Sequence, residues 1–245
     1  MASDPSNPIP NTLFNKPNGV DVYAGCNIDY KGADVTPGNF IAILKGDAAG
    51  VKGGNGKVLK STAESKVFIN FADHGAPGLI AFPSEYLYAP DLNSAINFMH
   101  TSKMYQEMVL YIEACESGSM FDGILAKDIN VYAVTAANPD ESSWGTYCPP
   151  DDMVNGVEIN SCLGDLFSVN WMEDAEKFSP ASETLDQQFG RVLNETDKSH
   201  VMRYGDLEFI KEPVGNFYGN LDLPTLDEKA KESNFFEVLF SKAKL

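Results

Sequence analysis

The chain has 245 residues, of which 43% are apolar and 11% aromatic, so it is long enough for one domain with a hydrophobic core and too apolar for a disordered chain. Its 18 basic and 35 acidic side chains give a formal net charge of −17, which repels phosphate backbones and anionic membrane surfaces and therefore disfavours nucleic acid as a partner. It contains no apolar run of the roughly 18 residues that a membrane span requires.

The N-terminal part of the chain is predicted to be mostly irregular. Residues 1–40 are rich in Pro, Asn, Asp and Gly, which favour turns. The first eight residues lack the basic and apolar regions of a secretory signal, so no signal peptide is expected here. Thr36 followed by Pro37 predicts a helix start, and a short helix should run through Leu44.

Apolar runs and helical spacing alternate in the middle of the chain. Buried strands are predicted over residues 66–72, 108–114 and 129–136. Between them, residues 91–104 show helical spacing with Asp91 as a possible cap, and residues 117–125 favour a short helix. This alternation predicts an α/β fold with a mainly parallel sheet flanked by helices.

Further helices are predicted near residues 163–173 and 184–194. Residues 221–245 combine a charged stretch with a run of apolar side chains and are predicted to form an appended helix or tail. The four cysteines are Cys26, Cys115, Cys148 and Cys162, and their positions leave three complete disulfide pairings open. No spacing of Cys or His indicates a zinc site, and no cofactor is expected.

Two predicted strands end in reactive residues. The first runs into Asp73-His74-Gly75 and the second into Glu113-Ala114-Cys115-Glu116. If the strands are parallel neighbours, their carboxyl ends share one crevice, where His74 can manage the proton of a Cys115 nucleophile. The N–H groups of Gly75 and Cys115 are candidate oxyanion donors, and a helix starting after Cys115 would favour the thiolate.

A structural role for these residues stays open on the pattern alone. A cysteine at the end of a buried strand is commonly a small core residue, and a histidine in a loop is commonly a polar surface group. The residues themselves therefore support two interpretations, a Cys115–His74 dyad and an ordinary strand end.

The motifs around both strand ends resemble the legumain family of asparaginyl endopeptidases. The similar blocks occur in the family's order over residues 17–23, 34–40, 71–78, 111–120, 135–143, 164–174 and 199–202. Residues 144–148 and 162–165 are most similar to the plant-type members. The resemblance implies a caspase-like α/β fold over residues 1–220, a thiol endopeptidase that cuts after Asn and less well after Asp, and peptide ligation as a side activity.

The same resemblance implies roles for individual residues. His74 and Cys115 match the catalytic pair, and Gly75 matches a contributor to the oxyanion hole. Residues that match the asparagine pocket are Glu113, Ser143 and Asp165. Asp73 matches a position that forms a succinimide in some members, and Cys148–Cys162 matches a disulfide of the plant-type members. Cys26 has no counterpart and is predicted to be a surface thiol outside that disulfide.

The resemblance also implies partners and a location. Expected partners are peptides or proteins with an accessible Asn, and cystatin-type inhibitors. Family analogy indicates a lysosomal, vacuolar or secreted protein. Asn194-Glu195-Thr196 is a glycosylation sequon, which matters only if the chain is secreted.

The chain departs from the family pattern at two ends. Members carry a further segment before the point where this chain begins, with the first core strand, a helix and an arginine of the pocket, whereas the first arginine here is Arg191. We expect the first strand and helix and the family's C-terminal inhibitory prodomain to be missing, and residues 221–245 form an unrecognised tail. Alternatives are therefore a catalytically incompetent paralogue that binds peptides or does nothing enzymatic, and the catalytic subunit of GPI transamidase, which the motifs and the lack of a membrane anchor disfavour.

Overall fold

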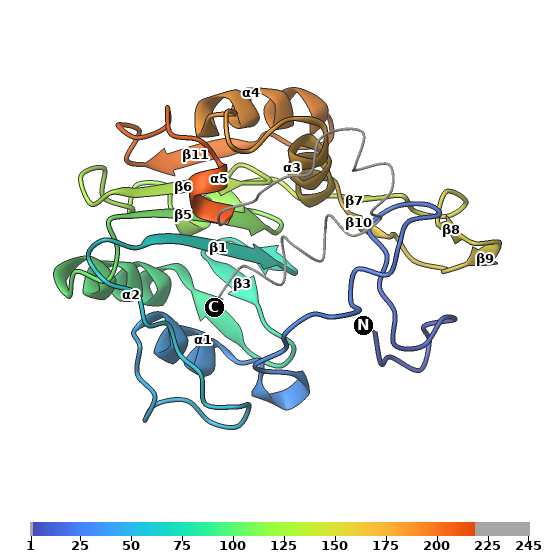
Figure 1. Ribbon diagram of the computed structural model, residues 1–245, viewed down its shortest axis with the longest axis horizontal. Helices are drawn as coiled ribbons and strands as arrows, with labels where there is room; N and C mark the ends of the chain where they lie inside the picture. Colours follow the sequence, from blue (N-terminus) through green and yellow to red (C-terminus); the bar gives the residue numbers. More distant parts are fainter. Residues whose placement is uncertain (1, 219–245) are drawn as a thin grey trace.

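The computed structural model describes residues 2–218, and its centre is a four-stranded sheet of order β1-β5-β6-β11 (Figure 1). The strands are β1 (Lys66–Ala72), β5 (Glu107–Glu113), β6 (Val131–Thr135) and β11 (Met202–Gly205). The first three run parallel, and β11 pairs with β6 in the antiparallel sense. The three predicted strands are confirmed within one or two residues, whereas β11 was not predicted.

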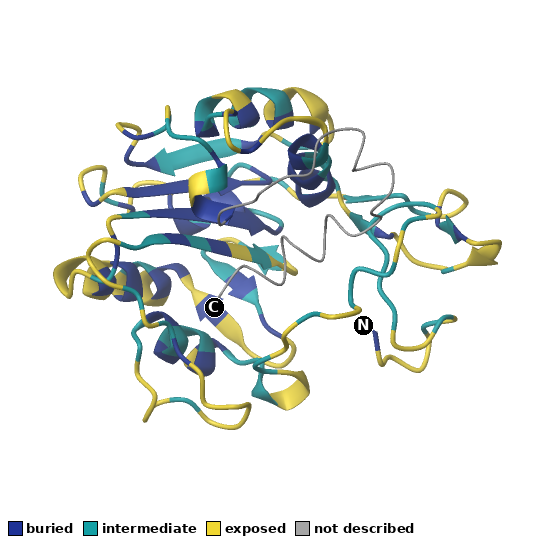
Figure 2. Ribbon diagram, viewed as in Figure 1, coloured by how far each residue is buried: buried dark blue, intermediate teal, exposed yellow. Residues whose placement is uncertain are grey.

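Helices cover both faces of the sheet, because side chains alternate between the faces along each strand. One face packs against α1 (Pro37–Leu44) and α2 (Ala89–Thr101). The other packs against α3 (Leu166–Lys177), α4 (Leu185–Glu195) and α5 (Gly215–Tyr218). Figure 2 shows the buried residues concentrated in the central strands and in the helix faces turned towards them. The predicted α/β fold with a mainly parallel sheet flanked by helices is confirmed.

Threonine side chains cap the starts of α1 and α4. Thr36 caps α1 by accepting a hydrogen bond from the N–H of Asn39 at 3.1 Å, and Thr184 forms a capping box with Gln187 at the start of α4. The prediction that Asp91 caps α2 is wrong. This helix begins at Ala89, because Pro90 fits its first turn, where no backbone N–H is needed, and Asp91 lies inside that turn.

The remaining strands are short and were not predicted. An antiparallel sheet joins β2 (Gly75–Ala76), β3 (Leu79–Ala81) and β4 (Tyr86–Tyr88). Two further pairs are β7 (Gly145–Thr146) with β10 (Gly164–Asp165), and β8 (Met153–Val154) with β9 (Val157–Glu158). They could not be predicted because a strand of two or three residues is too short to show an alternation of apolar and polar side chains.

The prediction of a helix over residues 117–125 is wrong. Only a four-residue 3-10 helix, η2 (Ser117–Met120), forms there, and a second 3-10 helix, η1 (Gly32–Asp34), precedes α1. The chain enters η2 through Glu116 in the left-handed conformation, with φ of 48°. The 3-10 helix is too short for a helix dipole, so the argument that a helix favours the Cys115 thiolate loses its basis.

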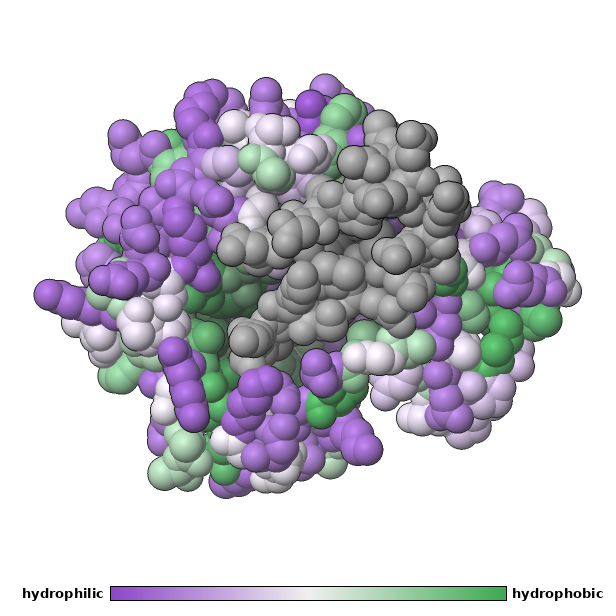
Figure 3. Space-filling view, in the orientation of Figure 1, coloured by the Kyte–Doolittle hydropathy of each residue, from purple (hydrophilic) through white to green (hydrophobic). Residues whose placement is uncertain are grey.

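Cys148 and Cys162 form the disulfide that the resemblance implied. Cys26 lies outside it, half-buried, and its thiol donates a hydrogen bond to the carbonyl of Val22 at 3.2 Å. None of the helices within residues 2–218 has the length and apolar character to cross a membrane. Hydrophilic side chains predominate along the left rim of the face shown in Figure 3. The predicted tail over residues 221–245 lies outside the described residues.

Candidate functional site

The carboxyl ends of β1 and β5 lie side by side at one edge of the sheet. Ala72 is in register with Glu113, and the N–H of Asp73 donates to the carbonyl of Glu113 at 3.1 Å. His74 lies two residues after Ala72, and Cys115 lies two residues after Glu113. The structure thus brings the loops of the two predicted catalytic residues together, at the right end of the sheet in Figure 1.

Glycine at position 75 allows this close approach. A Cβ atom there would collide with the carbonyl oxygen of Cys115 and lie 2.9 Å from the Cβ of Ala114. Gly75 opens β2, which pairs with β3, and the carbonyl of His74 accepts a hydrogen bond from Ala81 at 2.8 Å. The histidine loop is therefore held in place by a hairpin on one side and by the backbone after β5 on the other.

The Cys115 thiol is half-buried and faces Ser143. Its Sγ atom lies 3.8 Å from the Ser143 carbonyl oxygen, to which it can donate, and 4.0 Å from the Ser143 hydroxyl. His74 is exposed, and its backbone N–H donates to the carboxylate of Asp73 at 2.7 Å. The Cys115 sulfur is therefore partly accessible to solvent beside the polar groups of Ser143, and the imidazole of His74 is exposed on the neighbouring loop.

Glu113, two residues before Cys115 at the end of β5, is a buried acidic residue. The residue is 1% exposed, and its Oε2 accepts the N–H of Ser168, in α3, at 2.7 Å. Burial first, and then the negative charge of Asp165, raise the pKa of Glu113 to about 8, although hydrogen bonds from Ser168 and Ser143 oppose the shift. At acid and neutral pH this carboxyl group therefore holds a proton and can donate a hydrogen bond.

Asp165 reaches the site from a different part of the chain. It closes β10, where it pairs with Gly145 of β7. A Cβ atom at Gly145 would lie 2.9 Å from the sulfur of Cys162, so the disulfide packs directly behind this pair of strands. Desolvation raises the pKa of Asp165, with His74 opposing the shift and Asp73 adding to it. The carboxylate therefore lies within electrostatic range of both loops.

All seven residues proposed for the dyad, the oxyanion site, the pocket and the succinimide meet at this edge: Asp73, His74, Gly75, Glu113, Cys115, Ser143 and Asp165. Together they offer a thiol, an imidazole, a protonated carboxyl group, a carboxylate and a hydroxyl group. Among residues 2–218, no group of three or more His, Cys, Asp or Glu side chains could hold a metal ion.

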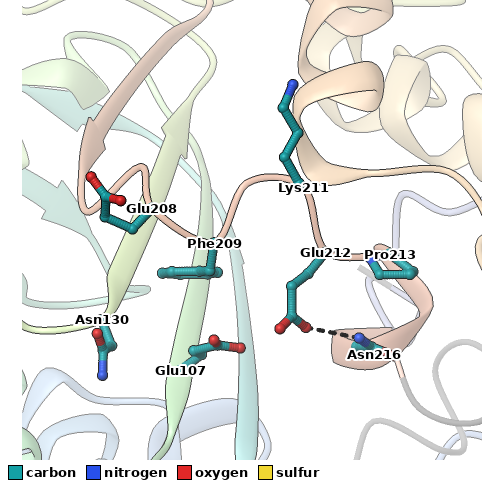
Figure 4. Close-up of a pocket in the computed structure, with 8 residues that line it drawn as sticks. All are labelled: Glu107, Asn130, Glu208, Phe209, Lys211, Glu212, Pro213 and Asn216. Carbon is teal, nitrogen blue, oxygen red and sulfur yellow. Dashed lines mark hydrogen bonds between the residues drawn. The ribbon is translucent and has the colours of Figure 1, made fainter.

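Other features lie away from this edge. A cavity of about 620 Å³ is lined by Glu107, at the opposite end of β5, and by residues of the loop after β11, as Figure 4 shows. Asn194 is exposed in the last turn of α4. Both arginines form ion pairs elsewhere, Arg191 with Glu183 and Arg203 with Asp186.

The sequence interpretation missed two residues that organise the site. The Ser119 hydroxyl donates to the carbonyl of Glu116, next to Cys115, while the Glu141 carbonyl accepts the N–H of Glu116 and its carboxylate binds the backbone of the same loop at Asn138. Both lie inside blocks that carry the family resemblance, but a side chain that binds backbone leaves no compositional pattern. The Asn138-Pro139 dipeptide, a turn signal, is the only hint that the chain before Glu141 folds back sharply.

Comparisons with known proteins agree with the resemblance. The profile of the Peptidase C13 family matches residues 1–220. A vacuolar-processing enzyme of Vicia sativa is 46% identical over 224 residues, which cover 89% of this chain and 45% of the relative. Legumain of Mus musculus is 50% identical over 220 residues, which cover 89% of this chain and 49% of the relative. The chain spans about half the length of these relatives.

A solved structure of caspase-1 from Spodoptera frugiperda aligns with 73% of this chain and 73% of its own, at 12% identity and a TM-score of 0.47. The family profile and the identities of 45–50% to vacuolar-processing enzymes and legumains confirm the resemblance found in the motifs. The chain belongs to the Peptidase C13 family.

Proposed function

We propose that the chain is the catalytic part of a cysteine endopeptidase that cuts peptide bonds after Asn, and less well after Asp. The observation that carries the proposal is the position of the Cys115 thiol, 3.8 Å from the carbonyl oxygen of Ser143 and two residues after the buried Glu113. A nucleophile and a polar recognition group are then two residues apart along the backbone.

The reaction begins when His74 accepts the proton of Cys115 and the thiolate attacks the carbonyl carbon after the substrate Asn. The N–H groups of Gly75 and Cys115 face the developing oxyanion. As the tetrahedral intermediate collapses, the C–N bond breaks and His74 returns the proton to the leaving amine. The thioester on Cys115 then reacts with water, which releases the acid and restores the thiol. If an amine attacks instead, a new peptide bond forms.

The pocket chemistry explains the preference for an amide side chain. The protonated Glu113 donates to the amide oxygen of Asn, while Asp165 and the Ser143 hydroxyl accept from its NH₂ group. An Asp side chain fits the same arrangement only when it is protonated, so its cleavage should increase at acid pH. Glu113 takes the donor role in this scheme, because both arginines are engaged elsewhere in the described part of the chain.

The test is cleavage of a peptide with one internal Asn at about pH 5.5, followed by mass spectrometry, beside matched peptides with Gln or Asp at that position. The proposal predicts a cut after Asn, a slower cut after Asp, none after Gln, and no cut by Cys115→Ala. A folded sample that leaves the Asn peptide intact would instead support the catalytically incompetent paralogue, which the engagement of both arginines favours.

Further proposals extend this function. The hydrogen bond between the N–H of His74 and the Asp73 carboxylate, at 2.7 Å, places the atoms that would join in a succinimide next to each other. Substrates are peptides or proteins with an accessible Asn, and cystatin-type proteins are the expected inhibitors. The name of the vacuolar-processing enzymes supports a vacuolar location. In such a compartment the exposed Asn194 would carry a glycan.

A further inference from the structure

Hydrogen bonds hold the backbone of Glu116 at both its N–H group and its carbonyl group. This residue follows Cys115 in the left-handed conformation, which a non-glycine residue adopts only when its surroundings enforce it. Its N–H donates to the carbonyl of Glu141 at 2.7 Å. Its carbonyl accepts the hydroxyl of Ser119 at 2.5 Å and the N–H of Ser119 at 2.8 Å. The position of Cys115 thus depends on two separate contacts.

Ser119 links this turn to the loop that carries His74. Its hydroxyl donates to the Glu116 carbonyl and accepts the N–H of Gly78 at 2.7 Å. Gly78 lies in the turn between β2 and β3, three residues after the Gly75 that packs on Cys115. One hydroxyl group therefore bridges the nucleophile turn and the histidine loop.

Glu141 links the same turn to the loop that carries Ser143. Its carboxylate accepts the backbone N–H groups of Asn138 at 3.0 Å and of His200 at 2.7 Å, and contacts Nδ1 of His200 at 2.8 Å. Burial alone would raise the pKa of Glu141, but these hydrogen bonds outweigh it and lower the pKa. The carboxylate thereby fixes the loop that ends at Ser143, beside the thiol.

We infer that Ser119 and Glu141 are positioning residues with different tasks: Ser119 aligns Cys115 with His74, and Glu141 aligns Cys115 with the pocket at Ser143. The inference rests on the proposed function. In that function, His74 on one loop accepts the proton of the thiol, and the loop at Ser143 holds the substrate that the thiol attacks. Neither residue touches the reacting atoms.

The two tasks can be told apart by comparing the rate of Cys115 alkylation with the rate of peptide cleavage. Iodoacetamide needs only the Cys115 thiolate, whereas an Asn peptide needs the thiolate and its alignment with the pocket. Glu141→Ala should lower kcat/KM for the Asn peptide by about tenfold or more through kcat, and leave alkylation of Cys115 within about twofold. Ser119→Ala should lower alkylation and kcat/KM together, by about tenfold. Peptide mapping distinguishes alkylation of Cys115 from alkylation of Cys26.

Matched variants control for lost charge and for a purely structural role. Glu141→Gln keeps an oxygen that accepts both backbone N–H groups, so it should restore kcat/KM to within about threefold. Asp140→Ala removes an exposed carboxylate next to Glu141, and should leave both readouts unchanged. All variants are compared well below their melting temperatures.

Hydrogen exchange supplies a readout that needs no turnover. Glu141→Ala should speed exchange of the Glu116 amide by about tenfold or more, and Glu141→Gln should not. Parallel losses of alkylation and turnover in both Ala variants, or no loss in either, would overturn the division of tasks. If the wild-type chain does not cut the Asn peptide, the proposed function fails, while the exchange and alkylation results still decide the positioning roles.

Discussion

At the scale of single residues, Glu113 is the carboxyl group of the candidate site with a strongly raised pKa. Its pKa is raised to about 8 from an ordinary value of 4.5, first by burial and then by the charge of Asp165. Between these two pH values the folded protein holds a proton that the unfolded chain has released. The resulting stabilisation is fully present below about pH 4.5 and is lost as the pH rises through about 8.

The first prediction concerns this pH dependence. Glu113 alone should lower the free energy of unfolding by on the order of 4 kcal/mol between about pH 4.5 and 8. Urea unfolding at both pH values should show the loss in the wild type. Glu113→Gln, which stays neutral, should flatten the dependence, whereas the exposed control Glu158→Gln should not. An unchanged slope in Glu113→Gln would show that this carboxyl group ionises normally.

A second prediction concerns the contact between the two loops. Gly75→Ala places a methyl group against the Cys115 carbonyl, so it should cost about 1–3 kcal/mol of stability and lower kcat/KM by roughly 100-fold. Gly190→Ala is the matched control, since a Cβ there meets nothing within 4 Å in α4, and it should be neutral or stabilising. Thermal unfolding and peptide cleavage measure both. Full activity in Gly75→Ala would mean that the loops are not in contact.

At the scale of elements, the long buried strands could be predicted from the sequence, whereas one helix start and the short strands around the site could not. Residues 66–72 form β1 as predicted, because a continuous apolar run with β-branched and aromatic residues favours a buried strand. The start of α2 was misplaced, since Asp91 and Pro90 both favour a helix start and only the proline's position is compatible with the observed turn. Short strands such as β10 depend on pairing with distant residues.

The same argument applies to the candidate site. The dyad and its shared edge were predicted because parallel neighbours bring strand ends together. Asp165 was predicted only by resemblance, since β10 reaches the site through its pairing with β7. Ser119 and Glu141 were not predicted at all, because apart from the His200 ring their side-chain partners are backbone groups, and any sequence can supply those.

A third prediction concerns the disulfide behind β7 and β10. Replacing Cys148 and Cys162 together by Ser opens a loop with a sequence separation of 14, which should cost about 3 kcal/mol. Asp165 should then lose its fixed position, so kcat/KM for the Asn peptide should fall by about tenfold. Denaturant unfolding and peptide cleavage report the two effects. A stability loss with unchanged kcat/KM would separate the disulfide from the pocket.

At the scale of the whole molecule, the net charge of −17 disfavours the folded state at neutral pH through self-repulsion. A fourth prediction follows. Raising NaCl from about 20 mM to about 500 mM should raise the melting temperature by a few degrees at pH 8, because salt screens these charges. Near the isoelectric point of about 4.4 the same salt should have little effect. An equal shift at both pH values would assign the effect to something other than net charge.

The whole arrangement makes one central claim, which is that Cys115 reacts with substrates because a pocket for Asn lies beside it. The most direct test is covalent labelling with a peptide that ends in an asparaginyl chloromethyl ketone, in which the thiolate displaces chloride, beside a matched glutaminyl probe. Mapping by mass spectrometry should place the asparaginyl label on Cys115, much faster than the glutaminyl label, and His74→Ala should slow it. Equal rates for the two probes, or a label on Cys26 instead, would contradict the account.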